Sequence, residues 1–124
     1  MDRISTGSPF EAAFGYSRAV VKGPWCFVSG VTGYDYASMA MPEAAAEQAR
    51  NCFTTIFSVL DQAGFSPTDI VRVQYTITDP AIADQIAPVL AGALGDIRPA
   101  ATMVIAGLIR PEMKVEIEVT ALRE

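Results

Sequence analysis

The chain has 124 residues, of which 51% are hydrophobic and 19% are charged. A chain of this length has the usual size of one compact domain and can bury about two-thirds of the surface that its unfolded form exposes. We therefore expect a single domain over residues 1–124. The net charge of −5 disfavours nucleic acid and anionic membrane surfaces as partners. Histidine is absent, which excludes Ser-His-Asp triads, Cys-His pairs and zinc sites built on histidine, and no metal site is predicted.

The two cysteines and the start of the chain indicate the compartment. Cys26 and Cys52 lie far apart and belong to no C-x-x-C pattern, so we expect both to be free and buried. The first residues contain no apolar signal-peptide region, and no stretch approaches the roughly 18 apolar residues that a membrane-spanning helix needs. These features predict a cytoplasmic protein.

Two apolar runs open the regular structure. Residues 19–21 and 25–29 are strand-like and are separated by Lys22-Gly23-Pro24, which predicts a hairpin or two linked strands. Residues 30–41 mix two glycines and two tyrosines without a usable period, so we expect a loop there.

A helix is predicted between Glu43 and Ala63. Pro42 suits the first helical position, and Gly64 suits the left-handed conformation just past the end. The apolar residues recur at steps of three and four, the spacing of one helical face, at Ala45, Ala49, Cys52, Phe53, Ile56, Leu60 and Ala63.

A strand and a second helix follow. Residues 70–78 alternate, with Val71, Val73, Tyr75 and Ile77 on one predicted face. Asp79-Pro80 then supplies a cap and a first-turn proline. The apolar face of this helix is expected to comprise Ile82, Ile86, Val89, Leu90 and Ala93.

Two further strands are predicted at the end of the chain, over residues 103–109 and 114–122. Arg110-Pro111-Glu112 lies between them as a turn, so we expect them to pair antiparallel. The element order favours an α+β sandwich in which two helices pack on one face of a single sheet. The other face is then either solvated or buried against another copy of the chain.

Several segments, in order and spacing, resemble the YjgF/YER057c/UK114 family, also called the Rid or RidA-like family. The resemblance runs through almost the whole chain and is carried by GSPFE, GYSRAV, FVSGVTG, PEAAAEQARN, RPAATMV and KVEIEVTA.

This resemblance implies a chorismate-mutase-like fold with a mixed sheet. It also implies a homotrimer with clefts between neighbouring subunits, which would cover the second sheet face. In the best-understood branch of the family, the activity is hydrolysis of reactive enamines and imines to keto acids and ammonia, without a metal or an organic cofactor.

Four positions match the family's cleft. The aromatic position falls on Tyr16, the small turn that helps to line the cleft falls on Ser29 and Gly30, and the first acidic residue of the Glu-x-Glu pattern falls on Glu116. Glu116 is the candidate that directs or deprotonates water. Glu118 faces the same side and is interpreted as a structural or interface contact.

One position departs from the family. The imine-deaminating branch has an arginine where this chain has Ala101, and that arginine grips the substrate carboxylate by a two-pronged bond. Arg18 and Arg98 are the candidates to replace this cation, with an exposed salt bridge or subunit contact as the alternative. Thr102 is a further candidate for ligand contact.

Three functions remain open at this point. The first is cofactor-free hydrolysis of an imine, an enamine or a related unsaturated small molecule. The second is a small-molecule-binding or regulatory trimer without turnover, which the alanine at position 101 motivates. The third, an endoribonuclease or translation inhibitor, comes from other proteins of the resembled family and is disfavoured by the net charge of −5 and the missing histidine.

Overall fold

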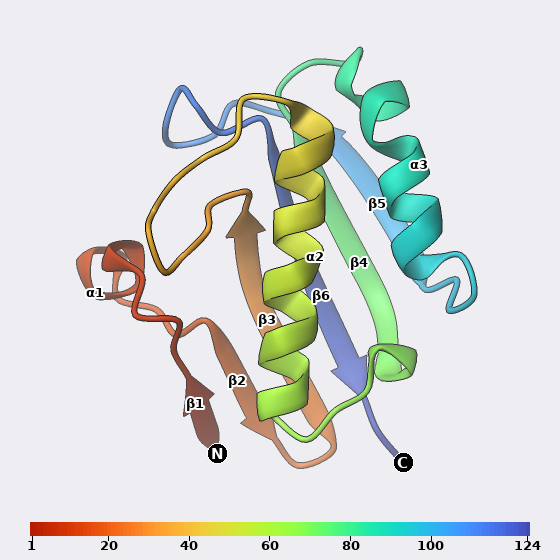
Figure 1. Ribbon diagram of the computed structural model, residues 1–124. Helices are drawn as coiled ribbons and strands as arrows, with labels where there is room; N and C mark the ends of the chain where they lie inside the picture. Colours follow the sequence, from red (N-terminus) through yellow and green to blue (C-terminus); the bar gives the residue numbers. More distant parts are fainter.

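The computed structural model describes all residues 1–124 (Figure 1). It contains three α-helices, a short 3-10 helix and six strands. In chain order these are β1 (Asp2–Ile4), α1 (Pro9–Phe14), β2 (Ala19–Lys22), β3 (Trp25–Thr32), α2 (Ala45–Gln62), the 3-10 helix Pro67–Asp69, β4 (Ile70–Ile77), α3 (Ile82–Leu94), β5 (Ala100–Ile105) and β6 (Val115–Leu122).

All six strands form one mixed sheet in the order β1-β2-β3-β6-β4-β5. Neighbouring strands are antiparallel except β4 and β5, which are parallel. The crossover that a parallel pair requires is supplied by α3 (Figure 1). The C-terminal strand β6 lies at the centre of the sheet between β3 and β4.

The expected antiparallel pairing of the last two strands is wrong. β5 pairs with β4, and the loop after β5 carries the chain across β4 to the far side, where β6 pairs with both β3 and β4. The physical reason is burial. β6 alternates cleanly, and its central place covers the apolar residues Val115, Ile117, Val119 and Ala121, each no more than 3% exposed.

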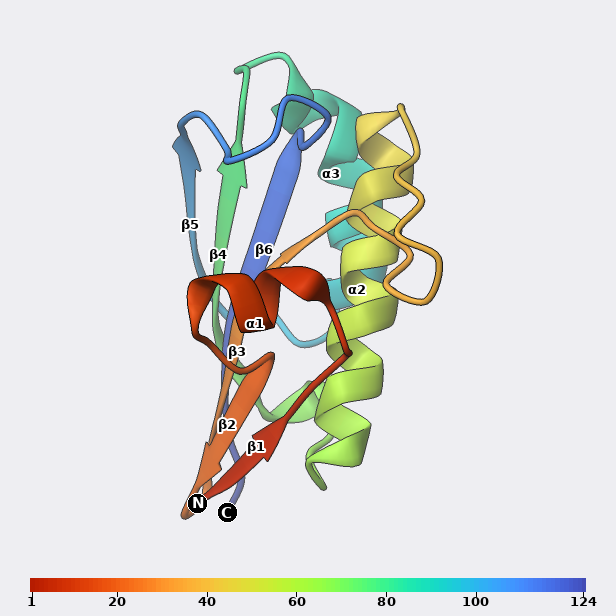
Figure 2. The same ribbon diagram turned by 90° about the vertical axis from the view of Figure 1, so that its left-hand side faces the viewer.

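Two long helices cover one face of the sheet, as the sequence predicts, and the α+β class is confirmed. Figure 2 shows the sheet edge-on, with α2 and α3 on one side and no helix layer on the other. The third helix, α1, was not predicted. It begins at a Ser8 cap and Pro9, ends at Gly15, and lies beside the edge of the sheet rather than on its covered face (Figure 2).

The core lies between the two long helices and the covered face of the sheet. From α2 it takes Ala49, Cys52, Ile56 and Leu60, all fully buried, on the predicted helical face. Each such isoleucine or leucine contributes about 1.5–3 kcal/mol on burial. Both cysteines are free and buried, as expected.

Four local predictions are corrected. β3 continues to Thr32, into the predicted loop over residues 30–41, and β5 spans Ala100–Ile105 instead of residues 103–109. Helix α2 begins at Ala45 and not at Pro42, because the Pro42 carbonyl accepts a hydrogen bond from the Gln48 side chain (2.8 Å) outside the helix. Val71 is 42% exposed and not in the core, because a register shift between Ile70 and Arg72 turns it outward. The predicted left-handed stop is present at Gly64, with φ of +79°.

The open face carries exposed apolar side chains. Trp25 and Phe27 of β3 stack there with ring centroids 5.9 Å apart and are 39% and 48% exposed. No residue of the edge strand β5 is buried. None of the helices combines the length and the apolar character that crossing a membrane would require.

Candidate active site

A β-bulge in β3 forms the centre of the candidate site. Val28 pairs with Val119 and Val31 pairs with Ile117, so β3 carries one residue more than β6 between these pairs. The extra residue falls at Ser29-Gly30. The Ser29 hydroxyl donates to the Ser17 carbonyl (2.6 Å), and its amide donates to the Arg18 carbonyl (2.9 Å). The bulge is therefore tied to the segment that leads into β2. Bulges are over-represented beside active sites because they redirect side chains and free backbone groups from pairing.

Glu116 on β6 lies directly against this bulge. A Cβ built on Gly30 would lie 2.6 Å from the Glu116 Cδ and 2.9 Å from each carboxylate oxygen. Only a glycine leaves room for the carboxylate at this place. The pKa of Glu116 is raised above its ordinary value by burial and by the neighbouring Glu118, against an opposing effect of Arg18.

A pocket of about 320 Å³ opens over the bulge. This volume lies at the small end of the range for ligand sites in proteins, about 300–1,000 Å³. The pocket combines two carboxylates, two hydroxyls, a backbone turn and apolar side chains, and is lined by Phe14, Tyr16, Ser29, Gly30, Ile109, Glu116 and Glu118.

Tyr16 supplies a phenol hydroxyl to the pocket. Burial is the largest influence on its pKa and raises it, against the lowering effect of the nearby Arg18. A tyrosine whose pKa lies above the ordinary value remains protonated at neutral pH and serves as a hydrogen-bond donor.

The structure brings four of the predicted site residues together: Tyr16, Ser29, Gly30 and Glu116 line the same pocket. Arg18 is beside them but does not line it. Its side chain is fully buried, and its Nη1 donates to the Gly30 carbonyl (2.7 Å).

The remaining predicted residues lie elsewhere in the protomer. Ala101 and Thr102 are on β5, which is separated from β6 by β4. The Thr102 hydroxyl accepts from the Arg72 guanidinium (3.2 Å). Arg98 precedes β5, has a φ of +52°, and its Nε donates to the Gly95 carbonyl (3.2 Å). Within one protomer these side chains do not reach the pocket.

Three pocket residues were not assigned to the site from the sequence. Glu118 was interpreted as a structural contact, although its place two residues from Glu116 on the same face was the signal that it lines the same surface. Phe14 and Ile109 are 57% and 59% exposed and follow no period, so no sequence pattern marked them.

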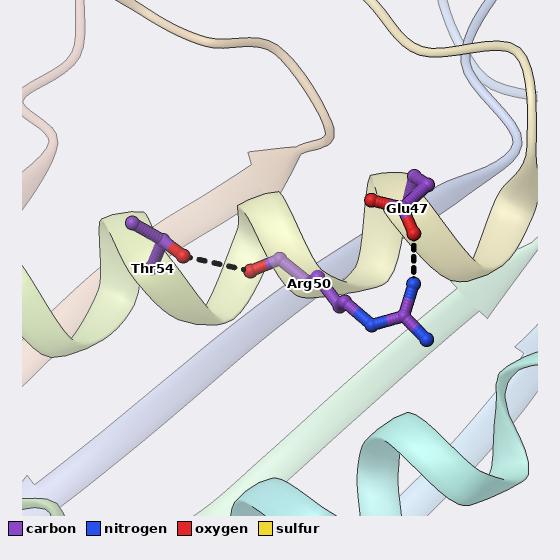
Figure 3. A network of polar contacts seen from close by, with 3 residues as sticks. All are labelled: Glu47, Arg50 and Thr54. Atoms are coloured by element: carbon purple, nitrogen blue, oxygen red, sulfur yellow. Dashed lines mark hydrogen bonds and ion pairs between the residues drawn. The ribbon is translucent and has the colours of Figure 1, made fainter.

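A larger hollow of about 470 Å³ lies on the outside of the helix layer, between α2 and α3. Its polar groups are engaged within α2: Arg50 forms an ion pair with Glu47, and the Thr54 hydroxyl donates to the Arg50 carbonyl (3.1 Å) (Figure 3). It holds no carboxylate, thiol or other reactive group among its lining residues. The pocket over the bulge is therefore the candidate site.

No group of three or more histidine, cysteine, aspartate or glutamate side chains is arranged to hold a metal ion. Cys52 is sealed in the core, where its thiol lies 3.2 Å from the Val31 carbonyl and burial raises its pKa above the ordinary value. A thiol of this kind is not a nucleophile at neutral pH.

The family model described as Endoribonuclease L-PSP matches residues 6–123. The solved structure of Rv2704 from Mycobacterium tuberculosis, a member of the YjgF/YER057c/UK114 family, is 38% identical, covers 98% of each chain and has a TM-score of 0.89. This chain belongs to the YjgF/YER057c/UK114 family. The match extends over nearly its whole length, so the family's fold applies to the complete sheet and both long helices.

Two further similar proteins are described by an activity or by a bound ligand. The 2-iminobutanoate/2-iminopropanoate deaminase of Bos taurus is 34% identical over 77 residues, which is 61% of this chain and 56% of that protein. The structure of Escherichia coli TdcF with bound serine is 25% identical, covers 88% of each chain and has a TM-score of 0.82. The family thus includes an imine deaminase and a protein that holds a small amino acid.

Proposed function

We propose that this protein hydrolyses an imine or enamine of a small molecule to the corresponding carbonyl compound and ammonia in the pocket over the β3 bulge. The observation that carries the proposal is the contact between the Glu116 carboxylate and the Gly30 backbone in a partly apolar pocket. The deaminase among the relatives supports the same reaction class.

Glu116 acts as the general base. Its carboxylate takes a proton from water while the water oxygen bonds to the imine carbon, and the Glu116 carboxyl passes that proton to the imine nitrogen, which receives the electron pair of the C=N π bond. Glu116 then takes the proton of the new hydroxyl group and delivers it to the same nitrogen as the carbon–nitrogen bond breaks, so that the carbonyl forms, ammonia leaves and the carboxylate is regenerated. Because the pKa of Glu116 is raised, its carboxylate is a stronger base than an ordinary glutamate. The Tyr16 hydroxyl donates a hydrogen bond to the reacting group.

The charge of the pocket argues for a substrate without a carboxylate beside the imine. The charged lining side chains are both acidic, Glu116 and Glu118, and the cation of Arg18 is buried outside the lining. A substrate carboxylate there would meet like charge at close range. The alanine at position 101 supports the same preference.

We also propose that the protein is a homotrimer whose subunits bury the open sheet face and complete the pocket. The exposed Trp25, Phe27 and Val104 on β3 and β5 support an apolar interface. Analytical ultracentrifugation measures the assembly directly, and a monomer at all concentrations would contradict it.

The experiment is ammonia release from a panel of freshly generated imines and enamines, with and without a carboxylate. The wild-type protein is expected to exceed buffer for members without a carboxylate. Glu116→Gln is expected to slow release by about 10²–10⁴-fold, the usual contribution of a positioned base. Glu47→Gln, which removes an exposed carboxylate of α2, is the matched control and is expected to retain the wild-type rate. Wild-type protein that accelerates no member of the panel would overturn the proposal.

A second candidate is a ligand-binding protein without turnover, favoured by Ala101, which stands where the deaminating branch that the chain resembles has its substrate-anchoring arginine. It predicts saturable binding by calorimetry with the ligand recovered unchanged. Ammonia release that appears only in Ala101→Arg would support this candidate over the enzyme.

A further inference from the structure

Arg18 occupies an unusual environment for a cation. It precedes β2, its side chain is fully buried, and it forms no ion pair, since the ion pair of the chain joins Arg50 to Glu47. Its Nη1 donates to the Gly30 carbonyl at 2.7 Å, while its Nε is buried without a hydrogen-bond partner. A buried charge without a paired carboxylate costs several kcal/mol unless other groups stabilise it.

Two aromatic rings provide part of that stabilisation. The Arg18 Cζ lies 4.9 Å from the ring centroid of Tyr36 and 5.6 Å from that of Tyr16. The planar guanidinium suits this arrangement, because it contacts ring faces and directs an N–H group along its edge. The Tyr36 hydroxyl lies 3.2 Å from both the amide and the hydroxyl of Thr32, so this ring is itself anchored to β3.

Gly30 connects Arg18 to the pocket. Its carbonyl accepts from Arg18, and its Cα faces the Glu116 carboxylate so closely that no Cβ fits between them. The same residue of the bulge therefore contacts the buried cation and the proposed base.

We propose that Arg18 is a positioning residue that holds the β3 bulge through the Gly30 carbonyl and places its positive charge on the bulge residue that contacts the Glu116 carboxylate. It does not contact the substrate. The catalytic part of this inference rests on the proposed function, whereas the electrostatic part does not.

The charges around Arg18 and Glu116 explain why this cation is needed. Burial and Glu118 both raise the pKa of Glu116, and Arg18 is the group that opposes them. Glu11 of α1 is buried beside this cluster. Burial raises its pKa, but hydrogen bonds from Thr6 and Ser5, together with the positive charge of Arg18, outweigh that effect and lower it. The titratable groups that face the cluster from the surrounding elements are Glu11, Tyr16, Tyr36, Cys52 and Glu118.

The test follows the titration of the Glu116 carboxyl by carbon NMR in protein labelled at glutamate, with Glu116→Gln used to assign the signal. In Arg18→Gln the midpoint is expected to move to higher pH, and Arg18→Lys, which keeps the charge, is expected to restore part of the shift. An unchanged midpoint in folded Arg18→Gln overturns the proposal.

Arg123→Gln is the matched control. Arg123 also donates to a glycine carbonyl, that of Gly64 (3.0 Å), and also lies over an aromatic ring, that of Phe65 (4.4 Å), but at the far end of β6. Its removal changes the net charge equally and is expected to leave the Glu116 midpoint in place. An equal shift in both variants would also overturn the proposal.

A wild-type measurement covers the case in which Arg18→Gln does not fold. The nitrogen NMR signal of Arg18 Nε is expected to titrate with the same midpoint as the Glu116 carboxyl and to lose that titration in Glu116→Gln. A flat Arg18 signal overturns the proposal.

The pH dependence of the ammonia-release rate distinguishes a failure of the role of Arg18 from a failure of the proposed function. The acid limb of the ammonia-release profile is expected to move with the NMR midpoint, because the ionised fraction of a carboxyl below its midpoint falls about tenfold for each pH unit that the midpoint rises. If the NMR midpoint moves but no imine is hydrolysed, the proposed function fails and the electrostatic role stands. If turnover occurs but its acid limb is the same in folded Arg18→Gln, the catalytic role of Arg18 fails.

Discussion

Two fully buried polar side chains, Gln48 and Arg18, lie in different surroundings. The Gln48 amide donates to the carbonyls of Pro42 (2.8 Å) and Glu112 (3.0 Å) and accepts from the Lys114 amide (2.9 Å). The Arg18 side chain makes one hydrogen bond, leaves its Nε without a partner, and carries a charge. A satisfied neutral group rigidifies a fold, whereas an under-satisfied charge remains available to polarise its neighbours.

The two sites also differ in what their glycines face. A Cβ on Gly33 would lie 2.4 Å from the Gln48 Cβ and 2.5 Å from its Cα, whereas the atoms nearest to a Cβ on Gly30 would be those at the end of the Glu116 side chain. The first obstacle is part of a helix backbone and the second is a side chain that can rotate away. Around Gln48 substitutions should therefore affect stability, and around the bulge they should affect the chemistry.

The largest expected effect on stability is that of Gln48→Ala. It removes the partners of three backbone groups in the two loops that Gln48 joins, so we expect a loss of about 3 kcal/mol in the free energy of unfolding. Denaturant unfolding measures this loss. Gln62→Ala, at the exposed end of the same helix, is the control and should change stability little. A Gln48→Ala protein as stable as the wild type would contradict the structural role of Gln48 and so the difference between the two sites.

Gly33→Ala is expected to destabilise the protein by about 1–3 kcal/mol, the usual cost of overpacking. The clash involves the Gln48 Cα, so either α2 or the loop must move. Thermal unfolding is the measurement. Any ammonia-releasing activity per folded molecule should stay near the wild-type value, and a selective loss of activity at full stability would contradict the assignment of Gly33 to the structural site.

Gly30→Ala should have the opposite profile. The new methyl group displaces the Glu116 carboxylate, so we expect ammonia release to fall about tenfold, equivalent to about 1.4 kcal/mol in the barrier, with a smaller change in unfolding. Gly92→Ala is the matched control, because nothing lies within 4 Å of a Cβ at that helical position. Equal effects of the two substitutions on turnover would contradict the role of the bulge.

The smallest expected effect is a pH-dependent gain in stability in Glu116→Gln. The folded-state pKa of Glu116 is raised, so its ionised form is penalised in the fold and the wild-type protein gains stability as the pH falls through that pKa. The variant lacks this penalty. Its melting temperature should exceed that of the wild type at neutral pH, and the difference should shrink on acidification. A constant difference across the pH range would show that the carboxylate is not penalised by folding.

The sequence predicted structure correctly where the spacing of apolar residues or a residue's backbone preference determines the local conformation. The alternation of residues 115–122 and the helical face of α2 predicted buried residues that the structure confirms. The family resemblance also assigned four residues from separate segments to one cleft, and they line one pocket in the structure. Local patterns did not reveal that β5 pairs parallel with β4, or that Val71 turns outward, since strand order and bulges depend on which edges remain unpaired after collapse.

By itself, the sequence determined the α+β class, the two long helices and the absence of imidazole chemistry, because these depend on composition and on periods of two and 3.6 residues. The tertiary structure alone decided that β6 lies at the centre of the sheet and that an arginine expected near substrate is buried against Gly30. A side chain's environment is set by neighbours distant in the chain. The bulge brings Gly30, Glu116 and Arg18 together from three separate segments, and no local sequence pattern predicts that these residues lie close together.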